Sequence, residues 1–144
     1  MLQTFRRFAT LDRMQRGLVI EAAVLMFLGW VGLRLFRFLT LQRLFDRVVM
    51  LTSSQPAAAE EDVVPRVRRA VIAVAARWSP ATCLVQALAA DVMLRRRRLS
   101  CVVRFGVRQT GTTGDPLEGH AWVECGGSTV DAIDGQSVFR VLSR

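Results

Sequence analysis

The sequence predicts an α+β fold in which helices come first and an antiparallel sheet follows. Apolar residues recur at helical spacing over the first two-thirds of the chain, and after Ser100 short alternating runs typical of strands replace them. Helices followed by a strand meander favour an α+β domain over parallel βαβ units. The 144 residues are 51% hydrophobic and 22% charged, which suffices for one packed core.

Residues 11–51 predict two or three helices, with Gly29 and Gly32 as break points. The uncharged apolar run at 22–33 is too short for a bilayer span, which needs about twenty residues. We therefore expect a core helix, with a basic amphipathic helix on a membrane or partner surface as the less favoured alternative. Residues 52–56 read as a linker. It divides the chain into an N-terminal helical region (1–52) that packs on a core (53–144).

The core region begins with a predicted helix over residues 57–78, whose start Pro65 can delay. A further helix is expected from Ser79-Pro80, since serine caps free backbone amides and proline is tolerated at the first position. That start places Cys83 in the first turn. The arginines at 95–98 lie at the carboxyl end of this helix, where the helix dipole is negative. We interpret them, with the basic N-terminal helices, as solvated faces or as a docking site for an acidic peptide or partner proteins.

Strands are predicted over residues 101–107, 120–125 and 128–133, and residues 138–142 can add a last one. The Gly/Thr-rich loop at 110–116 is either a surface connection or a cover over a binding channel. Gly126-Gly127 predicts a two-residue hairpin turn. In that register Cys125 faces Ser128.

Charge and cysteine content narrow the function classes. A formal net charge of +8 admits nucleic acid, anionic membrane or acidic polypeptides as partners, but no segment resembles a basic tail and we expect no nucleic acid. Three cysteines without a CxxC pair, beside a single histidine, predict no metal site, and nothing demands a cofactor. An odd cysteine count without a secretory signal predicts reduced thiols and a cytoplasmic location. We assign Cys101 and Cys125 to the core.

Cys83 and the only histidine, His120, have the pattern of a nucleophile and its base. A helix amino terminus and a neighbouring imidazole both stabilise a thiolate. Because side chains alternate along a strand, Asp131 shares the face of His120 and lies diagonally from it. A three-residue turn would instead bring Asp134 opposite His120. Nucleophile, base and orienting carboxylate would then follow in chain order, although core roles for the cysteine and histidine stay open on these residues alone.

The segment RWSPATCLVQALAADVMLRRRRL, a strand, GHAWVE and a hairpin aspartate together resemble the transglutaminase-like cysteine protease superfamily. More narrowly, residues 78–135 are similar to the B2 proteins, the leader peptidases of lasso-peptide biosynthesis. The resemblance implies Cys83, His120 and the hairpin aspartate as a catalytic triad. The match falls on Asp131 with a shorter turn than the family often has.

The resemblance implies a peptidase that cuts the leader from a ribosomally made precursor peptide through a thioester. Its expected partners are the precursor, a separate leader-recognition protein (B1) and the lasso cyclase. The Cys83 amide is a candidate oxyanion donor, with Gln86 as a second. Trp78 and Trp122 are expected either to line the cleft or to pack in the core.

Two alternatives compete with the peptidase hypothesis. A transglutaminase-like acyltransferase or deamidase would use the same thioester. A non-catalytic basic adaptor would bind partner proteins or membrane through the N-terminal helices, and would be indifferent to loss of the Cys83 thiol or the His120 ring.

Overall fold

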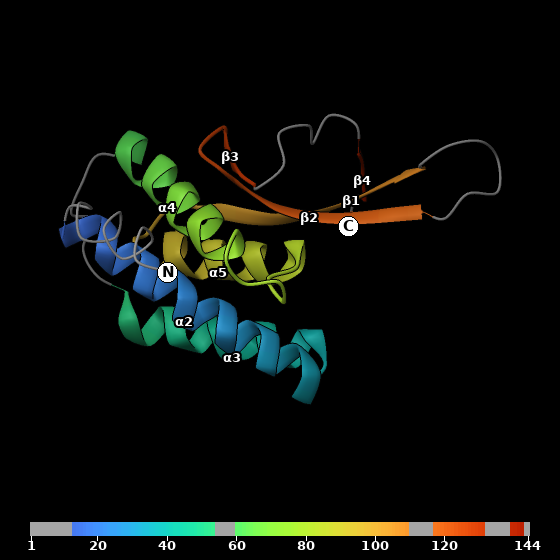
Figure 1. Cartoon of the computed structure of the whole chain (residues 1–144), viewed down its shortest axis with the longest axis horizontal. Helices are drawn as coiled ribbons and strands as arrows, with labels where there is room; N and C mark the ends of the chain where they lie inside the picture. Colours follow the sequence, from blue (N-terminus) through green and yellow to red (C-terminus); the bar gives the residue numbers. More distant parts are fainter. Residues whose placement is uncertain (1–12, 54–59, 110–116, 132–138, 143–144) are drawn as a thin grey trace.

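The computed structural model describes residues 13–53, 60–109, 117–131 and 139–142. Within these residues lie four helices and a four-stranded antiparallel sheet (Figure 1), which confirms the predicted α+β class. The elements in chain order are α2 (Arg13–Leu35), α3 (Phe38–Thr52), α4 (Glu60–Ala75), α5 (Cys83–Arg95), β1 (Cys101–Gln109), β2 (Leu117–Cys125), β3 (Ser128–Val130) and β4 (Arg140–Val141).

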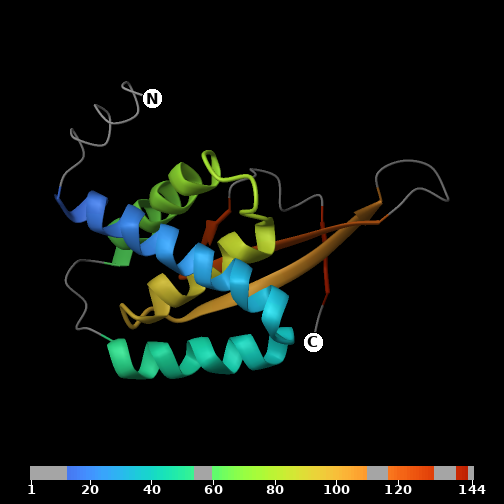
Figure 2. The same cartoon turned by 60° about the horizontal axis from the view of Figure 1, so that its bottom comes forward.

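Helix α5 lies between the sheet and the N-terminal helices. It packs against β1 and β2 on one side and against α2 and α4 on others (Figures 1 and 2). Almost every side chain in its second half is buried, from Ala87 to Leu94. A helix covered on all sides is apolar all round, which explains why α5 carries so few polar residues. Its contacts with α2 make this helix part of the core packing.

Two helix boundaries differ from the prediction. Helix α4 begins at Glu60, ends at Ala75 and contains Pro65. Helix α5 begins at Cys83 rather than at Ser79-Pro80, because its capping residue is Thr82, whose hydroxyl accepts a hydrogen bond from the Val85 N–H at 3.5 Å. Residues 78–82 form turns before that cap. Cys83 still lies in the first helical turn, as predicted.

The strands are ordered β3-β2-β1-β4 in the sheet. The predicted two-residue turn between β2 and β3 is confirmed, since Cys125 pairs with Ser128 and both turn glycines have positive φ angles, 56° at Gly126 and 80° at Gly127. Strand β3 ends at Val130. The predicted strand residues beyond Asp131, including Asp134, lie outside the described residues, as does the 110–116 loop.

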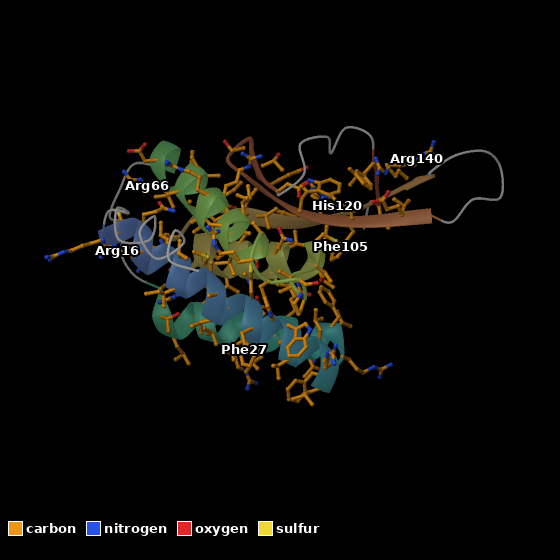
Figure 3. The ribbon with its side chains drawn as sticks, in the orientation of Figure 1. Arg16, Phe27, Arg66, Phe105, His120 and Arg140 are labelled. Atoms are coloured by element: carbon orange, nitrogen blue, oxygen red, sulfur yellow. A yellow bond between two sulfur atoms is a disulfide. The ribbon has the colours of Figure 1, made fainter. Side chains whose placement is uncertain are left out.

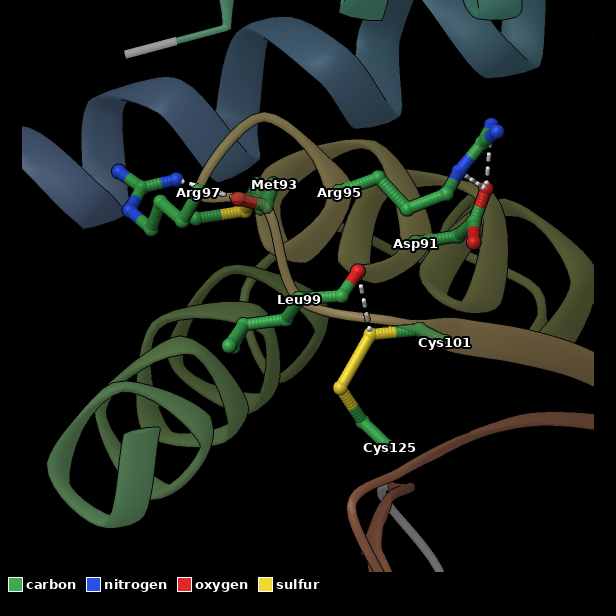
Figure 4. Close-up of a disulfide and its surroundings, with 7 residues drawn as sticks. All are labelled: Asp91, Met93, Arg95, Arg97, Leu99, Cys101 and Cys125. Carbon is green, nitrogen blue, oxygen red and sulfur yellow. Dashed lines mark hydrogen bonds and ion pairs between the residues drawn. A yellow bond between two sulfur atoms is a disulfide. The ribbon is translucent and has the colours of Figure 1, made fainter. Parts of the chain in front are cut away.

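Cys101 and Cys125 form a disulfide (Figure 4), which corrects the prediction of reduced thiols. The two residues stand directly opposite each other in the β1–β2 ladder. Cys125 is buried in the core, as expected, but the pairing of the strands brings its side chain to Cys101. Among the three cysteines, Cys83 is the free thiol.

The arginines that end α5 bind carboxylates of the N-terminal helices. Arg95 pairs with Asp46 of α3 at 2.8 Å. Arg96 and Arg97 both pair with Glu21 of α2, at 2.5 and 2.6 Å. The side chains are less than one-third exposed in all three arginines. For these three, the interpretation as a solvated face is therefore wrong, because their carboxylate partners lie within the domain.

Candidate functional site

His120 and Asp131 form a buried hydrogen-bonded pair. His120 lies in β2 and Asp131 directly follows β3, and the distance from His120 Nε2 to Asp131 Oδ2 is 2.7 Å. The two residues are only 6% and 7% exposed. The two-residue turn sets this geometry, because it places Asp131 diagonally from His120 on the same face of the sheet. A carboxylate in this position fixes the orientation and tautomer of the imidazole.

Aromatic rings enclose the imidazole on the same face. The ring of His120 stacks on Phe139 at 5.0 Å and on Trp122 at 5.9 Å between centroids. Gly106 of β1 is paired with His120, and a Cβ atom at Gly106 would lie within 3 Å of both Phe139 and Trp122. The absence of a side chain at this strand position therefore makes room for the two aromatic rings beside His120.

Two ion pairs border this aromatic cluster. Arg104 donates to Glu124 at 2.9 Å, and the Trp122 indole N–H donates to the same carboxylate at 3.2 Å. The hydrogen bond from Arg104 lowers the pKa of Glu124 from its ordinary value, and the one from Trp122 lowers it further by a smaller amount. The pairing holds the indole in place on the face of the sheet that carries His120. Glu124 thus orients a neighbour of His120.

The second ion pair borders Phe139. Arg108 of β1 binds Glu118 of β2 at 2.7 Å, and its guanidinium lies 4.9 Å from the centroid of the Phe139 ring. A guanidinium over an aromatic face is attractive. Phe139 therefore contacts both the Arg108 guanidinium and the His120 ring.

The backbone of Asp131 is bound from the helical layer. Arg68 of α4 donates through Nε to the Asp131 carbonyl at 3.1 Å. The preceding residue, Val130, is buried in the core. Asp131 thus follows an anchored strand end, while its carboxylate lies on the opposite face with His120.

Cys83 lies in a different layer from His120. Ala121 and Val123 of β2 belong to the core that α5 enters, so by alternation His120 points to the other face. Figure 3 shows His120 on the side of β2 away from α5, and Phe105 on the α5 side. Cys83 is half-buried against the core. In the part of the chain that the structure describes, no hydrogen bond joins its thiol to the imidazole.

Ideal helix and strand dimensions put Cys83 and His120 at about the same level along α5. Strand β1 runs back along α5 (Figure 2), which is about 20 Å long for its thirteen residues. At about 3.3 Å per strand residue, Gly106 comes level with the start of α5, and Gly106 is paired with His120. Strand β3 pairs with β2 only at residues 123–125. The edge of β2 at His120 is therefore beyond the end of β3.

The remaining predicted site residues divide between two places. Trp122 contacts the His120 ring, whereas Trp78 lies with Trp30 of α2, 6.0 Å between ring centroids, and with Phe27 at 6.5 Å. Trp78 therefore packs against α2 and the core, which is one of the two expected alternatives, and Trp122 packs beside His120. The Gln86 side-chain amide donates to the Ala81 carbonyl at 2.7 Å, so it is already engaged and is a poor oxyanion donor.

Sequence reasoning missed two residues at this site. Gly106 had a usable signal, because a glycine inside a strand often marks a close approach of neighbours. Phe139 had none, because its contact with His120 depends on where the chain returns after β3. No group of three His, Cys, Asp or Glu side chains that could hold a metal occurs among the described residues.

Comparison with known families identifies the chain at the family level. The model of a family described as the transglutaminase-like superfamily matches residues 29–144. The chain belongs to the transglutaminase-like superfamily. Members of this superfamily are generally cysteine peptidases or acyltransferases. The match begins within α2, so it includes part of the N-terminal helical region as well as the strands. No curated protein and no solved structure matches this transglutaminase-like chain.

Proposed function

We propose that this transglutaminase-like chain is a cysteine peptidase that removes the leader from a ribosomally made lasso-peptide precursor. The observation that carries the proposal is the buried His120–Asp131 hydrogen bond. It occurs in a chain whose free cysteine is the first residue of a helix that packs on the sheet. Superfamily membership and the similarity of residues 78–135 to B2 leader peptidases give further support.

In the proposed reaction His120 accepts the thiol proton, and Cys83 Sγ attacks the carbonyl carbon at the leader–core junction. The peptide C–N bond breaks, the leader is held as a thioester, and the protonated imidazole gives its proton to the departing amine of the core. Water then hydrolyses the thioester, which frees the leader carboxylate and restores the thiol. Asp131 holds the ring and stabilises the imidazolium. The Cys83 N–H, in the first helical turn, is an oxyanion donor.

This reaction requires the thiol to come within hydrogen-bonding distance of the imidazole. Catalytic hydrogen bonds of free enzymes are often long and tighten only when substrate binds. We infer that the two layers meet at the edge of β2 beyond β3, which pairs with β2 at residues 123–125. We propose that the precursor peptide, with the separate recognition protein B1 and the lasso cyclase as partners, completes the site there.

Mass spectrometry of the cleavage reaction tests this function. The precursor is incubated with B1 and with either wild-type protein or Cys83→Ala. We expect two fragments from a single junction with wild type and intact precursor with the variant. A Cys101→Ser/Cys125→Ser double variant is the matched control, because it removes the other two cysteines and should retain cleavage. An isopeptide or a deamidated product would instead identify an acyltransferase or deamidase, and unchanged precursor in every reaction would favour the adaptor.

Alkylation kinetics test whether thiol and imidazole meet. Cys83 is the free thiol among the three cysteines, so iodoacetamide reports on it alone in non-reduced protein. If His120 supports the thiolate, His120→Ala should slow alkylation at neutral pH by about tenfold or more. Equal rates in wild type and variant, in the presence of precursor and B1, would exclude the proposed dyad whatever the substrate.

A further inference from the structure

The outer face of α2 is an uninterrupted apolar stripe. Its inner face is buried in the core, but four large apolar residues on the other face are each about half exposed, at 49–57%: Ile20, Val24, Phe27 and Leu28. Residues at this spacing lie on one side of a helix. Figure 3 shows Phe27 on the side of the helices away from the sheet. Isolated exposed apolar residues are ordinary, whereas contiguous ones mark interaction sites.

The stripe continues through the corner between α2 and α3. Leu35 is 70% exposed, Phe36 50% and Leu39 55%. Among the described residues, α2 is the helix that is long and apolar enough to cross a membrane by length and composition. A domain of this size would not ordinarily leave so much contiguous apolar surface in water.

The acidic side chains of α2 and α3 are paired with arginines, whereas several arginines of these helices are exposed. In residues 13–53 the acidic residues are Glu21 and Asp46, and both bind the arginines that end α5. Exposed arginines remain on α2, α3 and the corner between them: Arg13, Arg34, Arg37, Arg43 and Arg47. Exposed cations are therefore left on these helices beside the apolar stripe, while the carboxylates of the same helices are paired with arginines of α5 and its end.

Aromatic side chains gather near the end of the stripe. The Arg34 guanidinium lies 4.5 Å from the centroid of the Trp30 ring, and Trp30 contacts Phe27 and Trp78. Tryptophan and arginine combine an apolar body with a polar end, and both are suited to the boundary between lipid chains and head groups.

The chemistry of the stripe favours lipid over protein. Protein interfaces carry about one hydrogen bond per 100–200 Å², but the exposed α2 residues between positions 17 and 28 are Gly, Ile, Ala, Val, Phe and Leu, with no hydrogen-bonding side chain. A membrane-spanning α2 is disfavoured, because Glu21 at mid-helix is bound by Arg96 and Arg97. A helix lying in the plane of the surface keeps these pairs intact.

We propose that the α2 face and its arginines dock this protein on an anionic lipid bilayer. The apolar stripe enters the boundary between head groups and acyl chains, and the bordering arginines bind lipid phosphates. This binding is independent of the peptidase chemistry, since it uses the face of the molecule away from His120.

Vesicle co-sedimentation of the full chain tests the proposal. Vesicles of phosphatidylcholine, with or without about one-fifth phosphatidylglycerol, are compared at low and high salt. We expect binding to the anionic vesicles that weakens with salt. Ile20→Ser/Leu28→Ser should lower the partition coefficient by about tenfold or more. Val102→Ser is the matched control, because Val102 is also 50% exposed but lies on β1, and it should bind like wild type.

A second pair of variants tests the charges. Arg43→Gln/Arg47→Gln should weaken binding by about fivefold for each arginine, whereas Arg69→Gln/Arg140→Gln removes the same charge from exposed residues on α4 and β4 and should have little effect. Circular dichroism establishes that each variant is folded. Protein that stays in solution with anionic vesicles, or that instead forms dimers abolished by the Ile20 and Leu28 substitutions, would overturn the proposal. So would equal binding by all variants.

Discussion

The ring of His120 is positioned by residues within or next to each of the four strands. Trp122 is two positions along β2, Gly106 faces His120 from β1, Asp131 follows β3 and Phe139 precedes β4. Such a ring is restrained by packing as well as by one hydrogen bond. Substitutions beside the ring should therefore affect activity without touching any reacting group.

Gly106→Ala tests this restraint. The new Cβ would lie within 3 Å of Phe139 and Trp122, and overpacking of this kind costs about 1–3 kcal/mol. We expect a lower free energy of unfolding in urea and a reduced kcat for precursor cleavage. Gly119→Ala is the control, because a Cβ there meets no atom within 4 Å although it adjoins His120. Equal effects of the two alanines would show that the enclosure is unimportant.

Asp131→Asn tests the carboxylate. The amide keeps the size of the side chain but removes the charge that stabilises the imidazolium, so we expect kcat to fall by about 10²–10⁴. The measurement is the cleavage rate at saturating precursor. Asp134→Asn should retain activity. The opposite result would assign the role to Asp134 and reject the register argument.

For single residues, the sequence predicts the His120–Asp131 pair but not the residues that enclose it, Gly106 and Phe139. The pair follows from a two-residue turn and strand alternation, both of which are local. The face on which it lies does not follow, because residues 120–123 are buried on both sides and give no contrast between polar and apolar positions. That is why a thiol in the α5 layer and an imidazole on the other face could not be separated from the sequence.

Helix α5 joins both halves of the domain. Its first residue is Cys83, and the arginines at and just after its end bind α2 and α3. The sequence predicts the existence and order of the helices, but the start of α5 depends on turns at residues 78–82 that compete with the Ser-Pro signal. The arginine run could not be interpreted either, since its partners lie about fifty and seventy-five positions away in the chain.

Glu21→Gln tests the attachment of α2 to α5. Glu21 accepts from Arg96 and Arg97 with only 16% of its side chain exposed, and hydrogen bonds between charged groups contribute about 1.5–3 kcal/mol. We expect the free energy of unfolding, measured in urea, to fall by this amount in the variant. Glu118→Gln breaks an ion pair of largely exposed side chains and should cost less than about 1 kcal/mol. Equal losses would contradict a special role for Glu21.

The pH dependence of stability tests the buried Asp91. Burial raises the pKa of Asp91 above its ordinary value of 3.8, and Arg95 offsets only part of that rise. The folded state then holds the proton more tightly than the unfolded state. The free energy of unfolding of wild type, relative to Asp91→Asn, should therefore fall as pH rises from 3.8 through the folded pKa. Urea unfolding of both proteins from acidic to neutral pH measures this relative free energy. If it stays constant or rises with pH, the raised pKa of Asp91 is contradicted.

The whole molecule consists of a helical layer and a sheet whose outer face carries the candidate base. Packing of the helical layer depends on apolar contacts and on the arginine pairs, whereas the two long strands are also joined by the Cys101–Cys125 disulfide. The sequence predicts the layers from its order of helices and strands. It did not predict the disulfide, because a pairing between distant cysteines requires knowledge of the strand register.

Reduction of the disulfide should destabilise the protein. The bond closes a loop with a sequence separation of 24, for which loop-closure entropy gives roughly 3 kcal/mol. Thermal and urea unfolding with and without reductant measure the loss. The Cys101→Ser/Cys125→Ser variant should show the lower stability in both conditions, and a wild-type protein indifferent to reductant would contradict the bond.

The disulfide also determines what happens to the protein when its backbone is cut between the two cysteines. Cys101 and Cys125 flank β1, β2 and the connection between them, so a backbone cut anywhere between these two residues leaves both pieces covalently joined. A preparation clipped in that segment, by its own activity or by another protease, would migrate as one band on a non-reducing gel. It would separate into two bands only after reduction, so intact and clipped enzyme are told apart by the reducing gel alone.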